Sequence, residues 1–118
     1  MICFLYYLKP EVMKDYVLIN NSDKLFVIKF SRIIKITSNG NCCDIEDAEG
    51  SRCSVSKCLS KVYSELPPTQ FIKVSQSCII NVQYLKVVDK KNKIIYLTNG
   101  EEIKYSIAIR DLIKYLII

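Results

Sequence analysis

The stretch Phe71–Leu85, FIKVSQSCIINVQYL, decides the fold, because two short apolar runs in it are separated by a polar interruption. Phe71 to Val74 and Cys78 to Val82 are rich in apolar and β-branched side chains, which favour extended strands. Ser75-Gln76-Ser77 lies between them and is typical of a polar bend. The stretch therefore predicts two strands joined by a short turn.

Similar β-rich segments continue on both sides of this stretch, with turn residues between them. Asn39-Gly40 predicts a type I′ turn and Asn99-Gly100 a second tight hairpin, while Asn20–Asp23 and Ala48–Gly50 predict two more turns. The pattern favours a mostly antiparallel β-domain. The other predicted strands are Tyr16 to Ile19, Leu25 to Phe30, Ile33 to Thr37, Cys43 to Asp47, Arg52 to Val55, Leu85 to Val88, Ile94 to Thr98 and Glu102 to Tyr105.

Two short helices are predicted in addition. The first covers Ser56–Leu66, with Ser54 or Ser56 as its cap and Pro67-Pro68 at its end. The second follows Ser106, a plausible cap, and is amphipathic. Its apolar face comprises Ile109, Leu112, Ile113, Leu116 and Ile117.

The composition argues against most enzyme chemistry. The chain has 118 residues, half of them apolar and a quarter charged, which is enough for one folded domain with its own core. It contains no His, so it cannot form a Ser-His-Asp or Cys-His nucleophile or a His-containing zinc site. We therefore expect a domain that is not an enzyme and has neither a cofactor nor a metal.

The positive charge is concentrated in the second half of the chain. Residues 1–55 carry seven basic and seven acidic side chains, whereas residues 56–118 carry ten basic and five acidic ones and hold the whole net charge of +5. This bias favours an anionic partner, either nucleic acid or an anionic membrane surface. Lysines also solubilise ordinary protein surfaces, so the charge alone does not decide between these interpretations.

The six cysteines predict reduced thiols in a cytoplasmic protein. They lie at positions 3, 42, 43, 53, 58 and 78, with no C-x-x-C pair among them. The alternative is a zinc site formed by Cys42, Cys43, Cys53 and Cys58, although their spacing matches no common zinc knuckle.

The chain opens with an apolar run, Ile2 to Leu8. Its seven residues are far fewer than the ~20 that cross a bilayer, so we expect a packed segment and no membrane partner. We assign residues 1–15 to an N-terminal apolar extension and residues 16–118 to the main domain.

Three separated motifs resemble the LytTR domain, a bacterial DNA-binding module. The stretch Phe71–Leu85 is similar to its core motif F-I-R-x-H-R-S-Y-I-V-N. Leu97–Gly100, followed by Lys104–Ser106, is similar to its L-x-N-G hairpin and V-S-R junction, and Ile33–Ile36 before Asn39–Asn41 to its first strand and turn. The resemblance extends from about Tyr16 to Leu116, so residues 16–118 are interpreted as a LytTR-like DNA-binding domain.

The resemblance implies both a fold and a function. The fold is mainly β, an elongated stack of small antiparallel sheets with one or two short helices. The partner is double-stranded DNA, which loops contact in successive major grooves, with pairs of protomers on repeated sites. Such domains regulate transcription, commonly behind the receiver domain of a bacterial response regulator in a two-component system, so a receiver domain or sensor kinase is an expected partner.

The resemblance places the first two groups of DNA-contacting residues in two turns. Asn39, Asn41 and Cys42 match the first loop; a side-chain amide can pair with adenine, but Asn beside Gly is equally what a tight turn requires. In the second loop Gln76 provides a side-chain amide that can pair with adenine. Lys73 matches a basic residue of the family that neutralises phosphate. Ser75 stands where the family usually has His.

The third group lies at the junction before the last helix. The family places one or two arginines after Ser106, whereas this chain has Ile107 and Ala108. Lys104 and Arg110 are nearby replacements. Asn81 matches a family Asn that we interpret as structural, bonding the backbone at a turn.

Two other interpretations compete with DNA binding. A degenerate LytTR-like module would serve protein interaction or dimerisation without specific DNA recognition, which the missing His and arginines and the apolar N-terminal run favour. An enzyme is the more distant alternative, based on a carboxylate cluster that alternates along a hairpin as a solvated strand face does. The cluster comprises Asp44, Glu46, Asp47 and Glu49.

Overall fold

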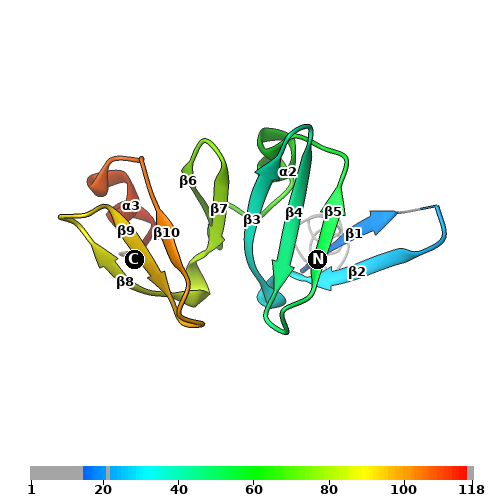
Figure 1. Ribbon diagram of the computed structural model, residues 1–118, viewed down its shortest axis with the longest axis horizontal. Coiled ribbons are helices and arrows are strands. Elements are labelled where there is room, and N and C mark those ends of the chain that lie inside the picture. Colours follow the sequence, from blue (N-terminus) through cyan, green and yellow to red (C-terminus); the bar gives the residue numbers. More distant parts are fainter. Residues whose placement is uncertain (1–14, 21, 117–118) are drawn as a thin grey trace, which may run out of the picture. The chain divides into compact units, whose positions relative to one another are not determined.

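The computed structural model describes residues 15–20 and 22–116 (Figure 1). The extension expected over residues 1–15, with its run Ile2 to Leu8, lies outside the described residues apart from Asp15. The chain forms two compact units, Met1–Ser31 and Arg32–Ile118.

The first unit contains a two-stranded antiparallel hairpin. β1 (Tyr16–Asn20) pairs with β2 (Leu25–Lys29) in a register that places Leu18 opposite Val27. The 3-10 helix η1 (Phe30–Arg32) follows, so the second strand ends one residue before its predicted boundary. Residues on one face of the hairpin are exposed although they are large and apolar: Tyr16, Leu18, Leu25 and Val27.

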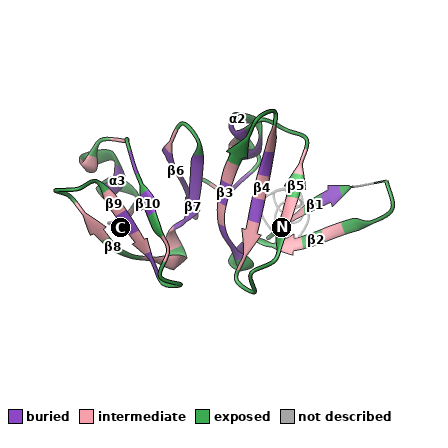
Figure 2. Cartoon of the chain, viewed as in Figure 1, coloured by how far each residue is buried: buried purple, intermediate pink, exposed green. Residues whose placement is uncertain are grey.

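The second unit begins with a five-stranded antiparallel sheet in the order β5-β4-β3-β7-β6. Its strands are β3 (Ile33–Asn39), β4 (Cys42–Asp47), β5 (Arg52–Val55), β6 (Phe71–Ser75) and β7 (Cys78–Asn81). The predicted hairpin is formed by β6 and β7, and β7 lies between β6 and β3. All four residues of β7 are buried, as a central strand covered on both faces requires (Figure 2).

A three-stranded antiparallel sheet follows, in the order β10-β9-β8. The 3-10 helix η2 (Val82–Tyr84) leads from β7 into β8 (Leu85–Asp89), which pairs with β9 (Ile94–Leu97), and β9 pairs with β10 (Glu102–Lys104). The α-helix α3 (Ile109–Leu116) follows β10. The expected mainly β fold, made of small antiparallel sheets with two short α-helices, is confirmed over the described residues.

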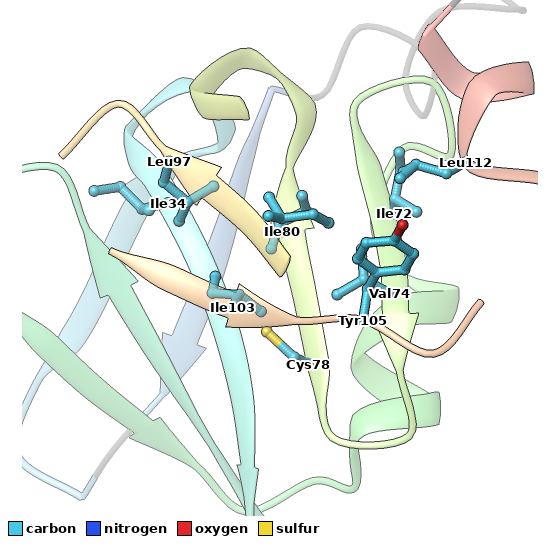
Figure 3. Close-up of a cluster of buried hydrophobic side chains, with 10 residues drawn as sticks. Ile34, Ile72, Val74, Cys78, Ile80, Leu97, Ile103, Tyr105 and Leu112 are labelled. Atoms are coloured by element: carbon cyan, nitrogen blue, oxygen red, sulfur yellow. The ribbon is translucent and has the colours of Figure 1, made fainter. Parts of the chain in front are cut away.

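A buried apolar cluster joins the two sheets of the second unit to α3 (Figure 3). Ile72 and Ile80 lie directly opposite each other on β6 and β7, and Leu112 of α3 is fully buried in the same cluster. Burial of this kind contributes about 25 cal/mol per Å² of apolar surface. The remaining members of the cluster are Ile34, Val74, Cys78, Ile95, Leu97, Ile103 and Tyr105.

The buried Asn81 has the structural role that the sequence predicted. Its Nδ2 donates to the carbonyl oxygen of Ile33 at 2.9 Å, and its Oδ1 accepts from the backbone N–H of Gln83 at 2.9 Å. A polar group at 0% exposure needs such partners. The side chain therefore fixes the turn from β7 into η2 against the start of β3.

The helix α2 (Leu59–Ser64) is shorter than predicted and is capped differently. Neither Ser54 nor Ser56 caps it; Cys58 occupies the N-cap position without a side-chain hydrogen bond. The Sγ of Cys43 donates to the carbonyl oxygen of Lys57 at 3.2 Å, and this contact holds the preceding residues against β4. A tertiary contact thus overrides the local helical spacing.

The type of the β3–β4 turn and the start of the last helix also differ from the prediction. The two residues of the β3–β4 turn are Gly40 and Asn41, and only Gly40 has a positive φ (+64°). This is the pattern of a type II′ turn, because type I′ needs positive φ at both positions.

The last helix begins at Ile109, so Ala108 rather than Ser106 precedes it. Ile113 was predicted to belong to the packed face of this helix, but it is 39% exposed.

The outer edge of β6 is covered by hydrogen bonds from both helical regions. The hydroxyl of Tyr63 in α2 donates to the carbonyl oxygen of Phe71 at 3.5 Å. The backbone N–H groups of Ser106 and Ile107 donate to the carbonyl oxygen of Val74 at 2.9 and 3.3 Å. An edge strand satisfied in this way presents few free groups to another chain.

A half-buried ion network joins the two sheets of the second unit. The Nζ of Lys35 in β3 lies 2.5 Å from a carboxylate oxygen of Glu101, after β9, and 3.7 Å from Glu46. Burial, the strongest influence, would lower the pKa of Lys35, but Glu101 and Glu46 outweigh it and raise that pKa. Burial would raise the pKa of Glu101, but hydrogen bonds from Lys35 and Asn99 outweigh it and lower that pKa.

We expect this network to stabilise the fold in a pH-dependent manner. The substitution E101Q should lower the free energy of unfolding at pH 7 by about 1 kcal/mol. Because the folded pKa of Glu101 is lowered, this contribution is complete above its unfolded value, near 4.5, and is lost as the pH falls through the folded value. Urea unfolding between pH 3 and pH 7 measures it. The exposed Glu102 gives the control E102Q, and equal pH profiles for the two variants would contradict the prediction.

Candidate nucleic-acid interface

Four connections of the second unit lie along one edge, which we call the loop edge. It consists of the β3–β4 turn (Gly40–Asn41), the β6–β7 turn (Gln76–Ser77), the β8–β9 turn (Lys90–Lys93) and the β10–α3 junction (Tyr105–Ala108). Figure 1 shows the first two turns and the junction along the upper side of the sheets.

Backbone hydrogen bonds link these four connections in a row. The N–H of Ser38 donates to the carbonyl oxygen of Ser77 at 2.9 Å and joins the first two turns. The N–H of Ser106 donates to Val74, just before the second turn, at 2.9 Å, and the N–H of Tyr105 donates to Lys93 at 3.1 Å. The loop edge is thus positioned by the main chain, independently of the side chains that it presents.

The first predicted site residues, Asn39, Asn41 and Cys42, lie in or directly beside the β3–β4 turn. Asn39 ends β3 and Asn41 is the second turn residue; both side chains are exposed. The Nδ2 of Asn39 lies 3.4 Å from a carboxylate oxygen of Asp44, a weak contact that leaves the amide accessible. Cys42 begins β4 and is only half-buried, opposite Asn39 in the register.

The second predicted group surrounds a recess of about 240 Å³. Its lining residues are Lys73, Ser75, Gln76, Ser106 and Ile107, so the structure brings the second loop and the third junction together. The Oγ of Ser75 accepts from the N–H of Ser77 at 3.3 Å and so shapes the turn. Gln76 lies in this turn and is exposed. No acidic residue is among the described residues that line the recess.

Lys73 lines the recess and is held by a hydrogen bond to α2. Its Nζ donates to the Oγ of Ser60 at 3.3 Å, and it makes no ion pair with a described carboxylate. A lysine held by one neutral hydroxyl keeps its charge available to an anion. The geometry therefore provides a cation beside the amide of Gln76.

Lys104 and Arg110 are separated from the recess. Lys104 is exposed on β10 and Arg110 is exposed in the first turn of α3, and neither lines the recess. Ile107 and Ala108 occupy the positions next to Ser106 instead. The junction therefore presents an apolar surface rather than a guanidinium group to whatever meets the loop edge.

The β8–β9 turn contributes a basic group that the predicted site residues omitted. It contains Lys90, Lys91 and Lys93, all exposed. The carboxylate of Asp89 accepts from the backbone N–H groups of Lys91 and Asn92 at 3.0 Å each and shapes the turn. Hydrogen bonds from Asn92 hold the pKa of Asp89 below its usual value. Three lysines in five residues were a signal for this group, but the placement required the hydrogen bond from Tyr105 to Lys93.

The carboxylates on which the enzyme alternative was based have structural partners nearby. Asp44 accepts from the Oγ of Ser54 at 2.6 Å, Asp47 accepts from two backbone N–H groups of its own hairpin turn, and Glu49 pairs with Arg32. Within residues 15–20 and 22–116, no three Cys, Asp or Glu side chains gather closely enough to hold a metal ion, the four cysteines of the zinc alternative included. Over the same residues, no helix is long and apolar enough to span a membrane.

The shape of the first turn can be tested with one substitution. Gly40→Ala places a Cβ at a positive φ and should lower the free energy of unfolding by about 1 kcal/mol. Asn41→Ala, at the neighbouring turn residue without positive φ, serves as the control, with an expected change within about 0.5 kcal/mol. Chemical denaturation measures both variants. A Gly40 variant as stable as the Asn41 variant would refute the turn geometry.

Comparisons with known proteins agree with the fold. A family model described as the LytTr DNA-binding domain matches residues 23–117. A solved LytTr DNA-binding domain, from a Bacillus cereus protein described as a putative methyl-accepting/DNA response regulator, has a TM-score of 0.73 at 21% identity. The match covers 87% of this chain and 97% of that one. A search of curated proteins found no match. Since the family model spans nearly the whole chain, the protein belongs to the LytTR family of DNA-binding domains.

Proposed function

We propose that this protein binds double-stranded DNA sequence-specifically to regulate transcription, with the loop edge entering the major groove. The observation that carries the proposal is the acid-free recess, where Lys73 and Gln76 meet the β10–α3 junction on an edge tied together by main-chain hydrogen bonds. An edge held by main-chain hydrogen bonds is suited to present its side chains to base pairs with little reorganisation.

The exposed amides supply the sequence recognition. Gln76 and Asn41 each carry a donor and an acceptor that match the N6 and N7 atoms of adenine in the major groove. Ile107 and Ala108 are suited to contact the methyl group of thymine. With Ser75 and these two residues in place of the family's His and arginines, the loop edge favours A·T pairs over G·C pairs.

The lysines supply affinity that is independent of sequence. Lys73 lies beside the recess, and Lys90, Lys91 and Lys93 extend the basic surface along the same edge. Each phosphate neutralised releases counterions and contributes to the salt dependence of binding. Under this proposal the protein acts in a bacterial cytoplasm, binds as pairs of protomers on repeated sites, and is linked to a receiver domain or a sensor kinase.

A second candidate function is protein interaction without specific DNA recognition. Two observations favour it: the arginine positions after Ser106 hold Ile107 and Ala108, and the β1–β2 hairpin exposes an apolar face that includes Leu18 and Val27. Selection of bound duplexes from a random pool at low salt distinguishes the candidates. Enrichment of A·T-containing sites supports DNA recognition, and the absence of any bound duplex supports the second candidate.

The role of Gln76 predicts a loss of specificity. Gln76→Ala should weaken binding to the selected site by about 1 to 3 kcal/mol and leave binding to unrelated DNA almost unchanged. The matched control is Gln83→Ala, because Gln83 is also exposed but follows β7 at the end opposite the β6–β7 turn. Fluorescence polarisation with both duplexes measures the effect; equal losses for the two variants would argue against base contact by Gln76.

The lysines of the β8–β9 turn should contribute to the salt dependence of DNA binding. Replacing Lys90 and Lys91 by Met should reduce the slope of log affinity against log salt by about 0.9 for each phosphate that the variant no longer neutralises. Selected and unrelated duplexes should be affected alike, because phosphates carry no base identity. Lys86→Met is the control, since Lys86 is exposed on β8 toward the end away from the turn. An unchanged slope in the double variant would exclude the β8–β9 turn from the interface.

A further inference from the structure

Asn39, the last residue of β3, has a main chain that is held in place and a side chain that is exposed. It lies opposite Cys42 across the β3–β4 turn. The N–H of the preceding Ser38 donates to the carbonyl oxygen of Ser77 at 2.9 Å. The remaining freedom of Asn39 is therefore in its side chain, whose terminal torsion allows two opposite orientations of the amide.

Three polar side chains on neighbouring strands lie beside this turn. Asp44 on β4 is directly opposite Thr37 on β3 and Ser54 on β5. Asn39 is two residues from Thr37, so the two side chains are on the same face of the sheet. We call Asn39, Asp44 and Ser54 the polar row.

Hydrogen bonds connect the polar row and hold the carboxylate of Asp44. The Oγ of Ser54 donates to one carboxylate oxygen at 2.6 Å, and the Nδ2 of Asn39 donates to the other at 3.4 Å. Asp44 is half-buried and forms no ion pair with a described Lys or Arg. Two neutral side chains, rather than a cation, therefore hold this carboxylate.

A carboxylate at this position selects one of the two orientations of the Asn39 amide. Ionised carboxylate oxygens only accept hydrogen bonds, whereas the amide has two N–H donors and one acceptor oxygen. A half-turn of the amide would place its Oδ1 against the carboxylate, with no hydrogen between the two oxygens. The amide therefore turns its Nδ2 toward Asp44 and keeps Oδ1 free for another partner.

We propose that Asp44 is a positioning residue for DNA recognition, which holds the amide of Asn39 in the orientation that reads adenine. Asp44 takes the N–H that points away from Oδ1. The opposite edge of the amide, with Oδ1 and the second N–H, is then presented to N6 and N7 of adenine in the major groove. This inference rests on the proposed function and adds to it a residue that sets specificity without contacting DNA.

The negative charge of Asp44 has a separate effect on affinity. No described Lys or Arg pairs with it, so it repels the phosphates of DNA near the β3–β4 turn. At a separation of about 10 Å in water, this repulsion weakens binding about twofold, whatever the sequence of the DNA. Loss of the charge should thus raise the affinity for every duplex, whereas loss of the acceptor should lower discrimination between duplexes. Destabilisation of the fold alone would not produce these two opposite effects.

The orientation of the amide is tested without DNA, through the side-chain amide signals in a proton–nitrogen correlation spectrum. D44A should shift the Nδ2 proton signals of Asn39. D44N should shift them less, because it keeps an acceptor for Asn39 and offers a donor to the Oγ of Ser54. The side-chain amide of Gln76, outside the polar row, is the internal control. Asn39 signals that stay unchanged in D44A would overturn the positioning.

Recognition is tested with sites selected from a random pool by the wild-type protein and by N39A. The base pair whose preference N39A loses is the one that Asn39 reads. D44A should reduce discrimination at that pair about fivefold and bind unrelated DNA about twofold more tightly. D44N should gain the same non-specific affinity and retain the discrimination. The control is E49A, which removes a carboxylate from the β4–β5 turn, at the other end of β4, and should change neither quantity.

The outcomes separate this inference from the proposed function. If the wild-type protein selects a site and N39A selects the same one, the inference is wrong and the proposed function stands. The same holds if D44A discriminates as well as the wild type, or if D44A and D44N lose discrimination equally. If the wild-type protein selects no duplex at all, the proposed function fails and the inference fails with it, even where the Asn39 signals depend on Asp44.

Discussion

The carbonyl oxygen of Val74 is the acceptor on which the second unit depends, because the N–H groups of both Ser106 and Ile107 donate to it. This pair of bonds fixes the β10–α3 junction against β6. It thereby sets the side of the sheet on which α3 places Leu112, and it forms one wall of the recess. If the junction were released, the recess and the core cluster, to which Tyr105 of the junction contributes, would be disrupted together.

The sequence predicted local structure well where short-range chemistry determines it. The polar interruption Ser75-Gln76-Ser77 became a turn, and Asn81 bonded the backbone as predicted. The sequence did not predict the features that depend on contacts between residues distant in the chain. Cys43 holds Lys57 and shortens α2. The bonds from Ser38 to Ser77 and from Tyr105 to Lys93, which gather the four connections on one edge, join residues that no periodicity relates. The sequence thus named candidate site residues, but it did not predict which of them the fold brings together.

Two lysines of the same sheet show how burial assigns different roles to the same side chain. Lys35 is only 17% exposed and is neutralised by Glu101 and Glu46, so its charge stabilises the fold and is not available outside. The Nζ of Lys73 donates to the Oγ of Ser60 and forms no ion pair with a described carboxylate, so its charge is available to a partner. Net charge therefore overstates the number of cations that can meet an anion, since ion pairs within the domain neutralise part of it.

The covered edge of β6 also has a consequence for solubility. Phe71, Ile72 and Val74 make this strand a short apolar segment of the kind that pairs readily with copies of itself when its edge is open. The groups that close the edge come from Tyr63 in α2, which is near in sequence, and from Ser106 and Ile107 before α3, which are distant in sequence. Undocking of either helix would thus expose part of this edge to pairing with another chain. For this chain, the docking of two short helices also keeps the edge of β6 from pairing with another chain.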